Sequence, residues 1–279
     1  MEKTLKSESH TTEEKYKRLK ADLKSMGSAL VAFSGGVDSS FLLKAASDEL
    51  KDKVIAVTAR SSSFPEREIK RAVEIAQLLK VKHIIIESSE MENPNYLKND
   101  KERCYYCKTE LFGDLRKIAL KEELNFVLDG QNYDDLGDYR PGMKAAAEIG
   151  VRSPLKEACL TKNEIREMSK KFGLPNWDSP SLACLASRIP YGTAINAEIL
   201  AKIDFLENLL LNLGFTQARV RHHDKMARIE IPEEEMEMFN TGDMRMQVIN
   251  EFKNKGYLYI TLDLEGYKTG SMNKVLNKK

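Results

Sequence analysis

The first half of the sequence alternates short apolar runs with longer amphipathic segments, and this alternation constrains the fold more than any other feature. Four runs rich in Val, Ile and Leu are expected to be strands: residues 28–33, 53–59, 83–88 and 125–130. Segments with apolar residues at i, i+3, i+4 and i+7, typical of helices that cover a sheet, lie between them: residues 40–50, 65–80 and 109–124. This order predicts an α/β fold with a doubly wound parallel sheet, covered by helices on both faces.

The rhythm changes after residues 188–192. A long helix, two short strands, a second helix and a last strand are expected in turn: residues 196–214, 218–223, 226–231, 243–256 and 257–264. This order predicts a smaller C-terminal α+β domain. We therefore expect a polar tail leading into a helix at 1–25, an α/β domain at 26–190 and the α+β domain at 191–279.

The charge balance bears on the partners of the chain. Lys and Arg total 44 and Asp and Glu total 43, so the formal net charge is +1 and no basic excess indicates a nucleic-acid partner. No apolar run approaches the roughly 20 residues of a membrane helix, and the first 20 residues are too charged for a secretory signal. We expect a cytoplasmic protein with no membrane partner. Its four cysteines are then expected to be ligands, redox groups or core thiols rather than disulfides.

A glycine-rich turn closes the first expected strand and opens the first helix. Its candidate nucleotide-binding residues are consecutive: Ser34, Gly35, Gly36, Val37, Asp38, Ser39 and Ser40. The glycines let a phosphate approach the main chain, and the serines and the N–H groups of the helix start donate hydrogen bonds to it. Asp38 beside an anion indicates Mg²⁺ between the two charges. The turn has no lysine, so it is not a Walker-type P-loop.

An acidic loop follows the fourth expected strand, at the same edge of a parallel sheet. It holds three aspartates: Asp134, Asp135 and Asp138. They are either solvated loop acids or part of the site. Arg140 and Arg152 offer guanidinium forks for an anion, or else pair with an acid or cap a helix. The run Thr161–Glu164 has the pattern of a capping box, which is a structural feature.

The turn with the pattern S-G-G-x-D-S resembles the PP-loop of ATP pyrophosphatases, which adenylate a substrate oxygen and release pyrophosphate. Together with four longer stretches it resembles the LarE family over nearly the whole chain; the stretches are residues 138–155, 174–193, 219–232 and 262–273. The resemblance implies an ATP-dependent sulfur transferase that builds the thiocarboxylates of the nickel-pincer nucleotide cofactor. It implies ATP and Mg²⁺ as cofactors, and a nucleotide as the small-molecule substrate. A carboxylate of pyridinium-3,5-biscarboxylic acid mononucleotide would be adenylated and then attacked by sulfur. The family also suggests a homo-oligomer, with the C-terminal domain serving substrate binding or assembly.

The cysteines suggest the sulfur source. Cys184 matches the position at which simpler members of the family give up their own sulfur and end as dehydroalanine. Cys104 and Cys107 add a C-x-x-C, and the three together resemble the branch of the family that binds a [4Fe–4S] cluster. Three cysteine ligands leave one iron open to an exogenous sulfide. The C-x-x-C by itself also suits a zinc half-site, a redox pair or two buried thiols. Cys159 is expected to pack, with a fourth ligand in a resting state as the alternative.

Several basic residues are candidates for binding the substrate phosphate. Ser187 and Arg188 follow Cys184 and are expected to hold a phosphate or to order the sulfur-bearing loop. Arg219 and Arg221 alternate along one strand, so both face one side, and the resemblance assigns them to the substrate phosphate. Lys268 stands where relatives commonly carry arginine and would contact a phosphate without a bidentate fork. Glu230 is expected on the surface.

Two other functions fit parts of the pattern. PP-loop tRNA thiolases also combine this loop with three cysteines, although the charge balance does not favour RNA binding. A non-catalytic ATP-binding module with structural zinc on the cysteines is the alternative from outside the enzymes.

Overall fold

The structure is a computed structural model that describes residues 11–137, 141–180, 183–240, 242–268 and 270–275. The chain forms two compact units. Unit 1 comprises Met1–Arg60, Glu66–Ser89 and Cys104–Ser181. Unit 2 comprises Ser61–Pro65, Glu90–Arg103 and Leu182–Lys279. Two short segments of the first half of the chain therefore belong to unit 2.

Unit 1 is built on a four-stranded parallel sheet. Its strands are β1 (Ala29–Ala32), β2 (Val54–Arg60), β3 (Lys82–Glu87) and β4 (Phe126–Leu128), in the order β3-β2-β1-β4. Ala29 stands opposite Val54 on one side and Phe126 on the other. All four strands predicted from apolar runs are present.

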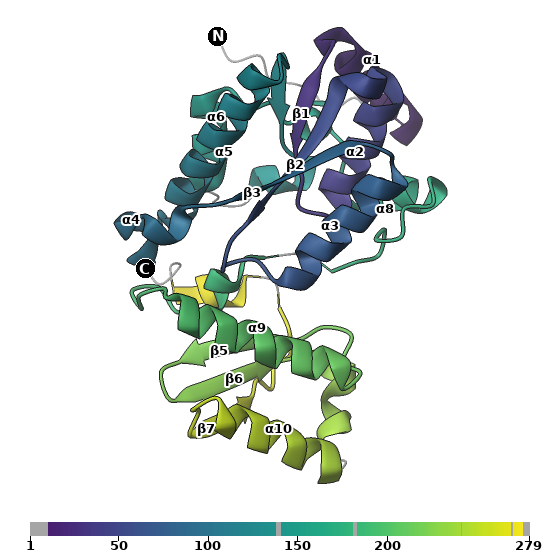
Figure 1. Ribbon diagram of the computed structural model, residues 1–279. Coiled ribbons are helices and arrows are strands. Elements are labelled where there is room, and N and C mark those ends of the chain that lie inside the picture. Colours follow the sequence, from purple (N-terminus) through teal and green to yellow (C-terminus); the bar gives the residue numbers. More distant parts are fainter. Residues whose placement is uncertain (1–10, 138–140, 181–182, 241, 269, 276–279) are drawn as a thin grey trace. The chain divides into compact units, whose positions relative to one another are not determined.

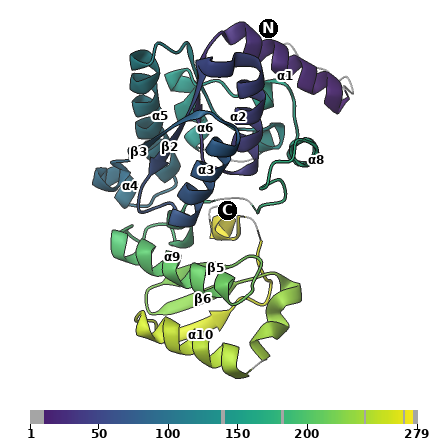
Figure 2. The same ribbon diagram turned by 45° about the vertical axis from the view of Figure 1, so that its right-hand side comes forward.

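Helices cover both faces of this sheet (Figures 1 and 2). They are α1 (Thr12–Met26), α2 (Val37–Leu50), α3 (Glu66–Leu78), α5 (Arg103–Lys121), α6 (Pro141–Ile149), α7 (Pro154–Glu157) and α8 (Lys162–Lys171). Ala29 and Val31 of β1 pack with α1, α2, α3 and α8, whereas Leu30 packs with α5 and α6. Successive residues of β1 thus enter two different cores, which confirms the predicted α/β fold with covered faces.

The strand order places one loop where such sheets bind ligands. The chain continues from β1 to β2 on one side, while β4 is added on the other, so the order reverses between β1 and β4. In open α/β sheets, ligands bind at the carboxyl ends of the strands beside this reversal. The glycine-rich turn after β1 and the loop after β4 meet there, since a Cβ on Gly130 would lie 3.0 Å from the backbone nitrogen of Ser39.

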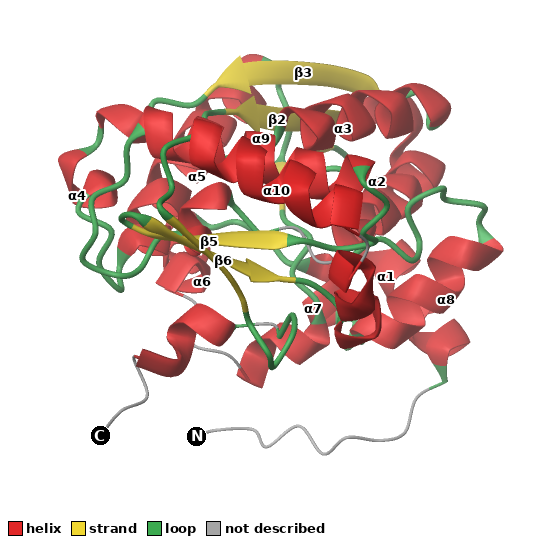
Figure 3. Ribbon diagram, turned by 90° about the horizontal axis from the view of Figure 1, so that it is seen from below, coloured by secondary structure: helices red, strands yellow, loops and turns green. Residues whose placement is uncertain are grey.

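Unit 2 is the expected smaller α+β assembly. Strands β5 (Arg219–His223) and β6 (Met226–Glu230) are antiparallel, and β7 (Tyr259–Leu262) adds to β6 in parallel. Figure 3 shows α9 (Ala197–Asn212) and α10 (Gly242–Asn254) beside each other over the same face of β5 and β6. The short helix α4 (Pro94–Leu97) also belongs to this unit. Among the described residues, no helix has the length and apolar character needed to span a membrane.

Candidate active site

The turn after β1 is shaped to receive an anion. Gly35 has φ +72°, and a Cβ there would lie 3.0 Å from the backbone nitrogen of Ala72, so only glycine fits. Gly36 is the N-cap of α2, and within the described chain no side chain caps this helix. The exposed Ser34 hydroxyl lies 3.1 Å from Ser39 Oγ and accepts a hydrogen bond from Gly36 N at 3.3 Å. Main-chain and hydroxyl donors therefore converge at an uncapped helix start, where a phosphate is bound favourably.

Asp38 occupies the second position of α2, beside this turn. Its Oδ2 lies 2.5 Å from Lys162 Nζ. Its Oδ1 is buried and makes no hydrogen bond of normal distance and angle in the described part of the chain, although the Asn132 side chain lies near enough to favour the charged carboxylate. Burial raises the pKa of the Asp38 carboxyl, and the ammonium of Lys162 opposes this rise. A buried carboxylate oxygen without a normal hydrogen bond, next to a phosphate-binding turn, fits a ligand of Mg²⁺.

Lys162 was missed by sequence reasoning, which interpreted its surroundings as helix capping alone. The capping box is present. The Thr161 side chain accepts a hydrogen bond from Glu164 N, and the Glu164 side chain accepts one from Thr161 N. Lys162 follows Thr161 at the first helical position, and its own backbone N–H donates to Asp134 Oδ2 at 2.8 Å. A cation in the first turn opposes the helix dipole. That mismatch was the available signal that Lys162 has a partner of its own.

The remaining residues of the turn support its shape. Val37 is 3% exposed and packs in the core, so it contributes its backbone only. Ser39 Oγ donates to Gly36 O at 3.1 Å. Ser40 is fully buried and its Oγ accepts from Asn176 Nδ2 at 2.9 Å. Of the three serines, Ser34 presents an exposed hydroxyl.

The acidic loop after β4 is held by internal hydrogen bonds. Asn132 N donates to Asp135 Oδ2 at 3.0 Å, and Asp134 N donates to Asn132 Oδ1 at 2.9 Å. Arg152 is engaged by acids, with its Nε 3.0 Å from both carboxylate oxygens of Glu157. Its Nη2 contacts Asp22 at 3.1 Å. The other two candidates of this region, Asp138 and Arg140, lie outside the described residues.

Cys104 and Cys107 lie in the first two turns of α5, which begins at Arg103, six residues before the expected helix. Residues three apart share one face of a helix. Cys104 is exposed and Cys107 partly buried. The start of α6 packs closely here, because a Cβ on Gly142 would lie 3.4 Å from the backbone oxygen of Cys104. Within the described residues, no group of three or more His, Cys, Asp or Glu side chains is arranged to hold a metal ion.

Cys184 belongs to unit 2 and immediately precedes a 3₁₀ turn, Leu185–Arg188. Arg188 is 1% exposed and pairs with the fully buried Glu207 of α9, with Nε–Oε1 at 2.9 Å. Its Nη1 donates to the carbonyls of Ala183 at 2.7 Å and Cys184 at 3.0 Å, and to Ser187 Oγ at 2.9 Å. Arg188 therefore ties the backbone on both sides of the Cys184 peptide to α9.

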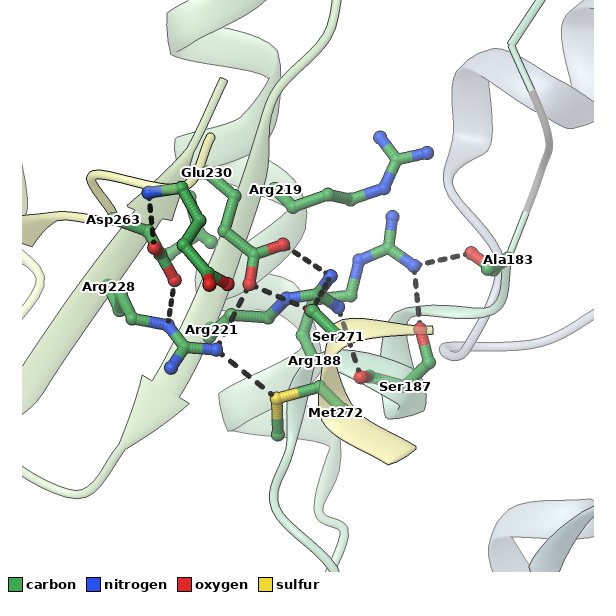
Figure 4. A network of polar contacts seen from close by, with 12 residues as sticks. Ala183, Ser187, Arg188, Arg219, Arg221, Arg228, Glu230, Asp263, Ser271 and Met272 are labelled. Carbon is green, nitrogen blue, oxygen red and sulfur yellow. Dashed lines mark hydrogen bonds and ion pairs between the residues drawn. The ribbon is translucent and has the colours of Figure 1, made fainter. Parts of the chain in front are cut away.

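A second group of arginines lies on the β5–β6 pair (Figure 4). Antiparallel pairing sets Glu230 opposite Arg219 and Arg228 opposite Arg221, so their side chains share one face. Arg221 Nη2 contacts Glu230 Oε2 at 2.6 Å and Ser271 Oγ at 3.0 Å. Arg228 Nη2 contacts Glu230 Oε1 at 3.0 Å. The expectation that Glu230 lies on the surface was wrong: it is fully buried, because two guanidiniums bond it there.

The arginine cluster consists of Arg188, Arg219, Arg221 and Arg228, with the acids Glu207, Glu230 and Asp263 bonded to its members. Burial lowers the pKa of Arg219, and the charge of Arg188 lowers it further, so like charges are held together here. An anion would relieve this repulsion. Arg219 and Arg221 are 6% and 5% exposed, whereas Lys268 is exposed. Glu207 was missed by sequence reasoning, although it falls among the buried residues Ile203, Leu206 and Leu210 of α9.

Comparisons with known proteins cover both units. Residues 28–102 match the family of the queuosine biosynthesis protein QueC. The chain is 37% identical over 261 residues to the pyridinium-3,5-bisthiocarboxylic acid mononucleotide synthase of Lactiplantibacillus plantarum, covering 93% of this chain and 94% of that protein. It is 44% identical over 266 residues to an uncharacterized protein of Synechocystis, covering 95% of this chain and 99% of that protein. An uncharacterized protein of Methanocaldococcus jannaschii is 30% identical over 240 residues, covering 86% of this chain and 90% of that protein.

Proposed function

The chain belongs to the LarE family, and from this premise we propose that it is an ATP-dependent sulfur transferase of pyridinium-3,5-bisthiocarboxylic acid mononucleotide synthesis. The substrate is the corresponding biscarboxylic acid mononucleotide. The observation that carries the nucleotide-binding part is Asp38, whose buried Oδ1 makes no normal hydrogen bond in the described chain beside an uncapped helix start. Lys162 already contacts Oδ2, so Oδ1 is the oxygen left for the Mg²⁺ that a pyrophosphate group would bring.

The proposed first step activates a carboxylate. A carboxylate oxygen of the substrate attacks the α-phosphorus of ATP, the bond to the bridging oxygen breaks, and pyrophosphate leaves with the electron pair. Gly36 N–H, the Ser34 hydroxyl and the start of α2 supply donors for the phosphates. Mg²⁺, held by Asp38, would neutralise phosphate charge when bound. Lys162 supplies a second cation, 2.5 Å from Asp38 Oδ2.

The proposed second step transfers sulfur. A sulfur nucleophile attacks the acyl carbon of the adenylate, a carbon–sulfur bond forms, and AMP leaves with the electron pair. The buried arginines of β5, Arg219 and Arg221, are proposed to bind the phosphate of the substrate, and exposed Lys268 to add a monodentate contact. Support comes from the like charges gathered around Arg219. Arg188 and Ser187 are proposed to order the loop that carries Cys184.

The proposal includes two sources of sulfur. Cys184 Sγ can form the thioester itself, after which loss of the Cα proton breaks the Cβ–S bond and leaves dehydroalanine. Alternatively Cys104, Cys107 and Cys184 hold a [4Fe–4S] cluster that would supply sulfide when bound. The C-x-x-C at the start of α5, with Cys104 exposed and Cys107 partly buried, supports two of these ligands, and the third rests on the family resemblance. Assembly into a homo-oligomer stays a prediction.

The test of ATP use compares two aspartates of the same helix. Asp48 lies ten residues after Asp38 on α2 and pairs with Lys44 at 2.6 Å. We expect wild type and Asp48→Ala to form AMP and pyrophosphate from ATP when the mononucleotide substrate is added, and Asp38→Ala to form neither. Equal AMP formation by Asp38→Ala and Asp48→Ala would contradict the proposal.

A further inference from the structure

Asn176 fastens the phosphate-binding turn from a distant part of the chain. Its side-chain Nδ2 donates to Gly35 O at 2.8 Å and to Ser40 Oγ at 2.9 Å. The two contacts bridge 141 and 136 residues of sequence. Asn176 is 3% exposed, so both amide hydrogens are used on the turn and α2 away from water. None of the functions considered above gives this side chain a role.

The segment that carries Asn176 is itself fixed. Leu174, just after the end of α8, is 2% exposed, and its N–H donates to Ser169 O at 3.0 Å. Beyond it, Ser179 N donates to Asn176 O at 3.1 Å. The backbone on both sides of Asn176 is thus held by a buried anchor and a turn. The amide is presented to Gly35 by a rigid support rather than by a mobile loop.

The contact with Gly35 O determines where the next N–H points. Gly35 O and Gly36 N–H belong to one peptide group, and the described chain contains no cis peptide bond. In a planar trans peptide the C=O and the N–H point in opposite directions. Because Asn176 holds the oxygen on the buried side, Gly36 N–H is directed toward the exposed Ser34 hydroxyl, 3.3 Å away. That is the side on which a phosphate would be received.

The hydrogen bond from Asn176 to Gly35 O is needed because the two residues of this peptide are glycines. Gly35 has φ +72°, and neither Gly35 nor Gly36 has a side chain to limit rotation of the peptide between them. A rotated peptide would turn the carbonyl oxygen toward the phosphate and the N–H away from it. One donor would be replaced by an acceptor, which repels an anion.

We propose that Asn176 is a positioning residue that holds the Gly35–Gly36 peptide in its phosphate-binding orientation. This inference rests on the proposed use of ATP at the turn, and it adds a residue that acts through the peptide rather than by touching the nucleotide. Its action has two requirements: an N–H donor on residue 176, and a pyrophosphate-bearing ligand whose binding depends on the direction of Gly36 N–H.

The test uses two substitutions of Asn176 in the full-length protein, with ATP and the mononucleotide substrate. Asn176→Ala removes the amide, and Asn176→Asp keeps its shape but replaces the donor by an acceptor facing Gly35 O. We expect both to lower kcat/KM for ATP by about 10- to 100-fold, less than the roughly 100- to 1000-fold lost when a donor is removed, because the Gly36 N–H is misdirected rather than absent. The KM for the mononucleotide should change less than twofold. Asn176→Asp should be at least as impaired as Asn176→Ala.

Asn125 provides the control, because its Nδ2 also donates to a backbone carbonyl, that of Met26 at 2.9 Å. Asn125 lies before the first residue of β4, so it is at the amino ends of the parallel strands, whereas the turn is at their carboxyl ends. Asn125→Ala should lower the melting temperature without changing kcat/KM for ATP. If Asn176→Ala retains the wild-type value, the amide donor is unimportant and the inference is overturned.

A crystal structure of Asn176→Ala gives a readout independent of ATP use. We expect the Gly35–Gly36 peptide to be rotated or to adopt two orientations. A single orientation identical to that of the wild type overturns the inference, whatever the kinetics. A wild type that makes no AMP from ATP would instead refute the proposed function, so the two failures are distinguishable.

Discussion

Lys162 Nζ lies 2.5 Å from Asp38 Oδ2, although 124 residues of sequence separate the two side chains. The contact joins the first turn of α8 to the first turn of α2. The ammonium of Lys162 balances the negative charge of Asp38 as long as no metal-bound pyrophosphate is present. Both helix starts also favour negative charge through their dipoles. The pair is therefore part of the proposed ATP site rather than a surface ion pair.

Removing the charge of Lys162 is expected to weaken catalysis. Lys162→Met leaves the transferred phosphate with one cation fewer, and we expect the rate of AMP formation to fall by about 100-fold. Lys171→Met, an exposed lysine in the last turn of the same helix, is the control and should keep the wild-type rate. Initial rates of AMP release measure both. Equal rates in the two variants would mean that Lys162 only supports the helix.

The negative charge of Asp38 should lower the free energy of unfolding at neutral pH. Burial raises its pKa in the folded chain, so the folded state binds the proton more tightly than the unfolded state. The charged form then destabilises the fold above that pKa, and the cost disappears as pH falls through it. We expect Asp38→Asn to melt about 2–4 °C above the wild type at pH 7, although it makes no AMP. The gain should shrink toward acidic pH. A gain independent of pH would exclude this explanation.

The sequence predicted the sheet well because buried parallel strands are continuous apolar runs. Residues such as Ala29, Leu30 and Val31 of β1 are buried on both faces, so no alternation obscures them. The start of α5 was placed six residues late, because the apolar periodicity was followed only from Thr109 and the segment with Cys104 and Cys107 was not assigned to the helix. Apolar periodicity carries no information on such polar segments.

The candidate site was predictable where function depends on a contiguous motif. The turn Ser34–Ser40 was identified because glycines, serines and an aspartate are adjacent there. Lys162, Asn176 and Glu207 were not, because each acts on a partner that only the folded chain brings near. Glu230 was misplaced for the same reason: its burial depends on guanidiniums supplied by two strands.

Breaking the Arg188–Glu207 pair should strongly destabilise unit 2. Both side chains are at most 1% exposed, so Glu207→Ala leaves a buried guanidinium without its carboxylate. We expect a loss of about 3–5 kcal/mol in the free energy of unfolding, measured by urea titration. Lys44→Ala, which breaks the partly exposed pair with Asp48, should cost about 0–1 kcal/mol. A small loss in Glu207→Ala would show that the buried pair contributes little.

The same pair predicts a response to acid. Arg188 lowers the pKa of Glu207 in the folded chain, against the opposing effect of burial. A lowered carboxyl pKa contributes stability that is present above the unfolded value and is lost as pH falls through the folded one. The ordinary pKa of glutamate is 4.5, so unit 2 should keep this contribution above that pH and lose it below. In Glu207→Gln, urea stability should fall less steeply below pH 4.5 than in the wild type.

The cysteines are best tested by iron content and by mass in the same preparation. If Cys104, Cys107 and Cys184 hold a cluster, anaerobically purified protein should contain about four irons and four acid-labile sulfides per chain. Cys104→Ser and Cys184→Ser should lose them. Cys159→Ser should keep them, because Cys159 lies in a turn after α7 and has no assigned role.

Mass spectrometry after turnover distinguishes the second sulfur source. A sacrificial Cys184 ends as dehydroalanine, so the peptide containing it loses the mass of hydrogen sulfide, and each chain makes a single turnover. A cluster-based donor leaves that peptide intact and allows repeated turnover when sulfide is supplied. Iron-free protein that still turns over repeatedly with Cys184 intact would contradict both, because neither Cys184 nor a cluster would then be providing the sulfur.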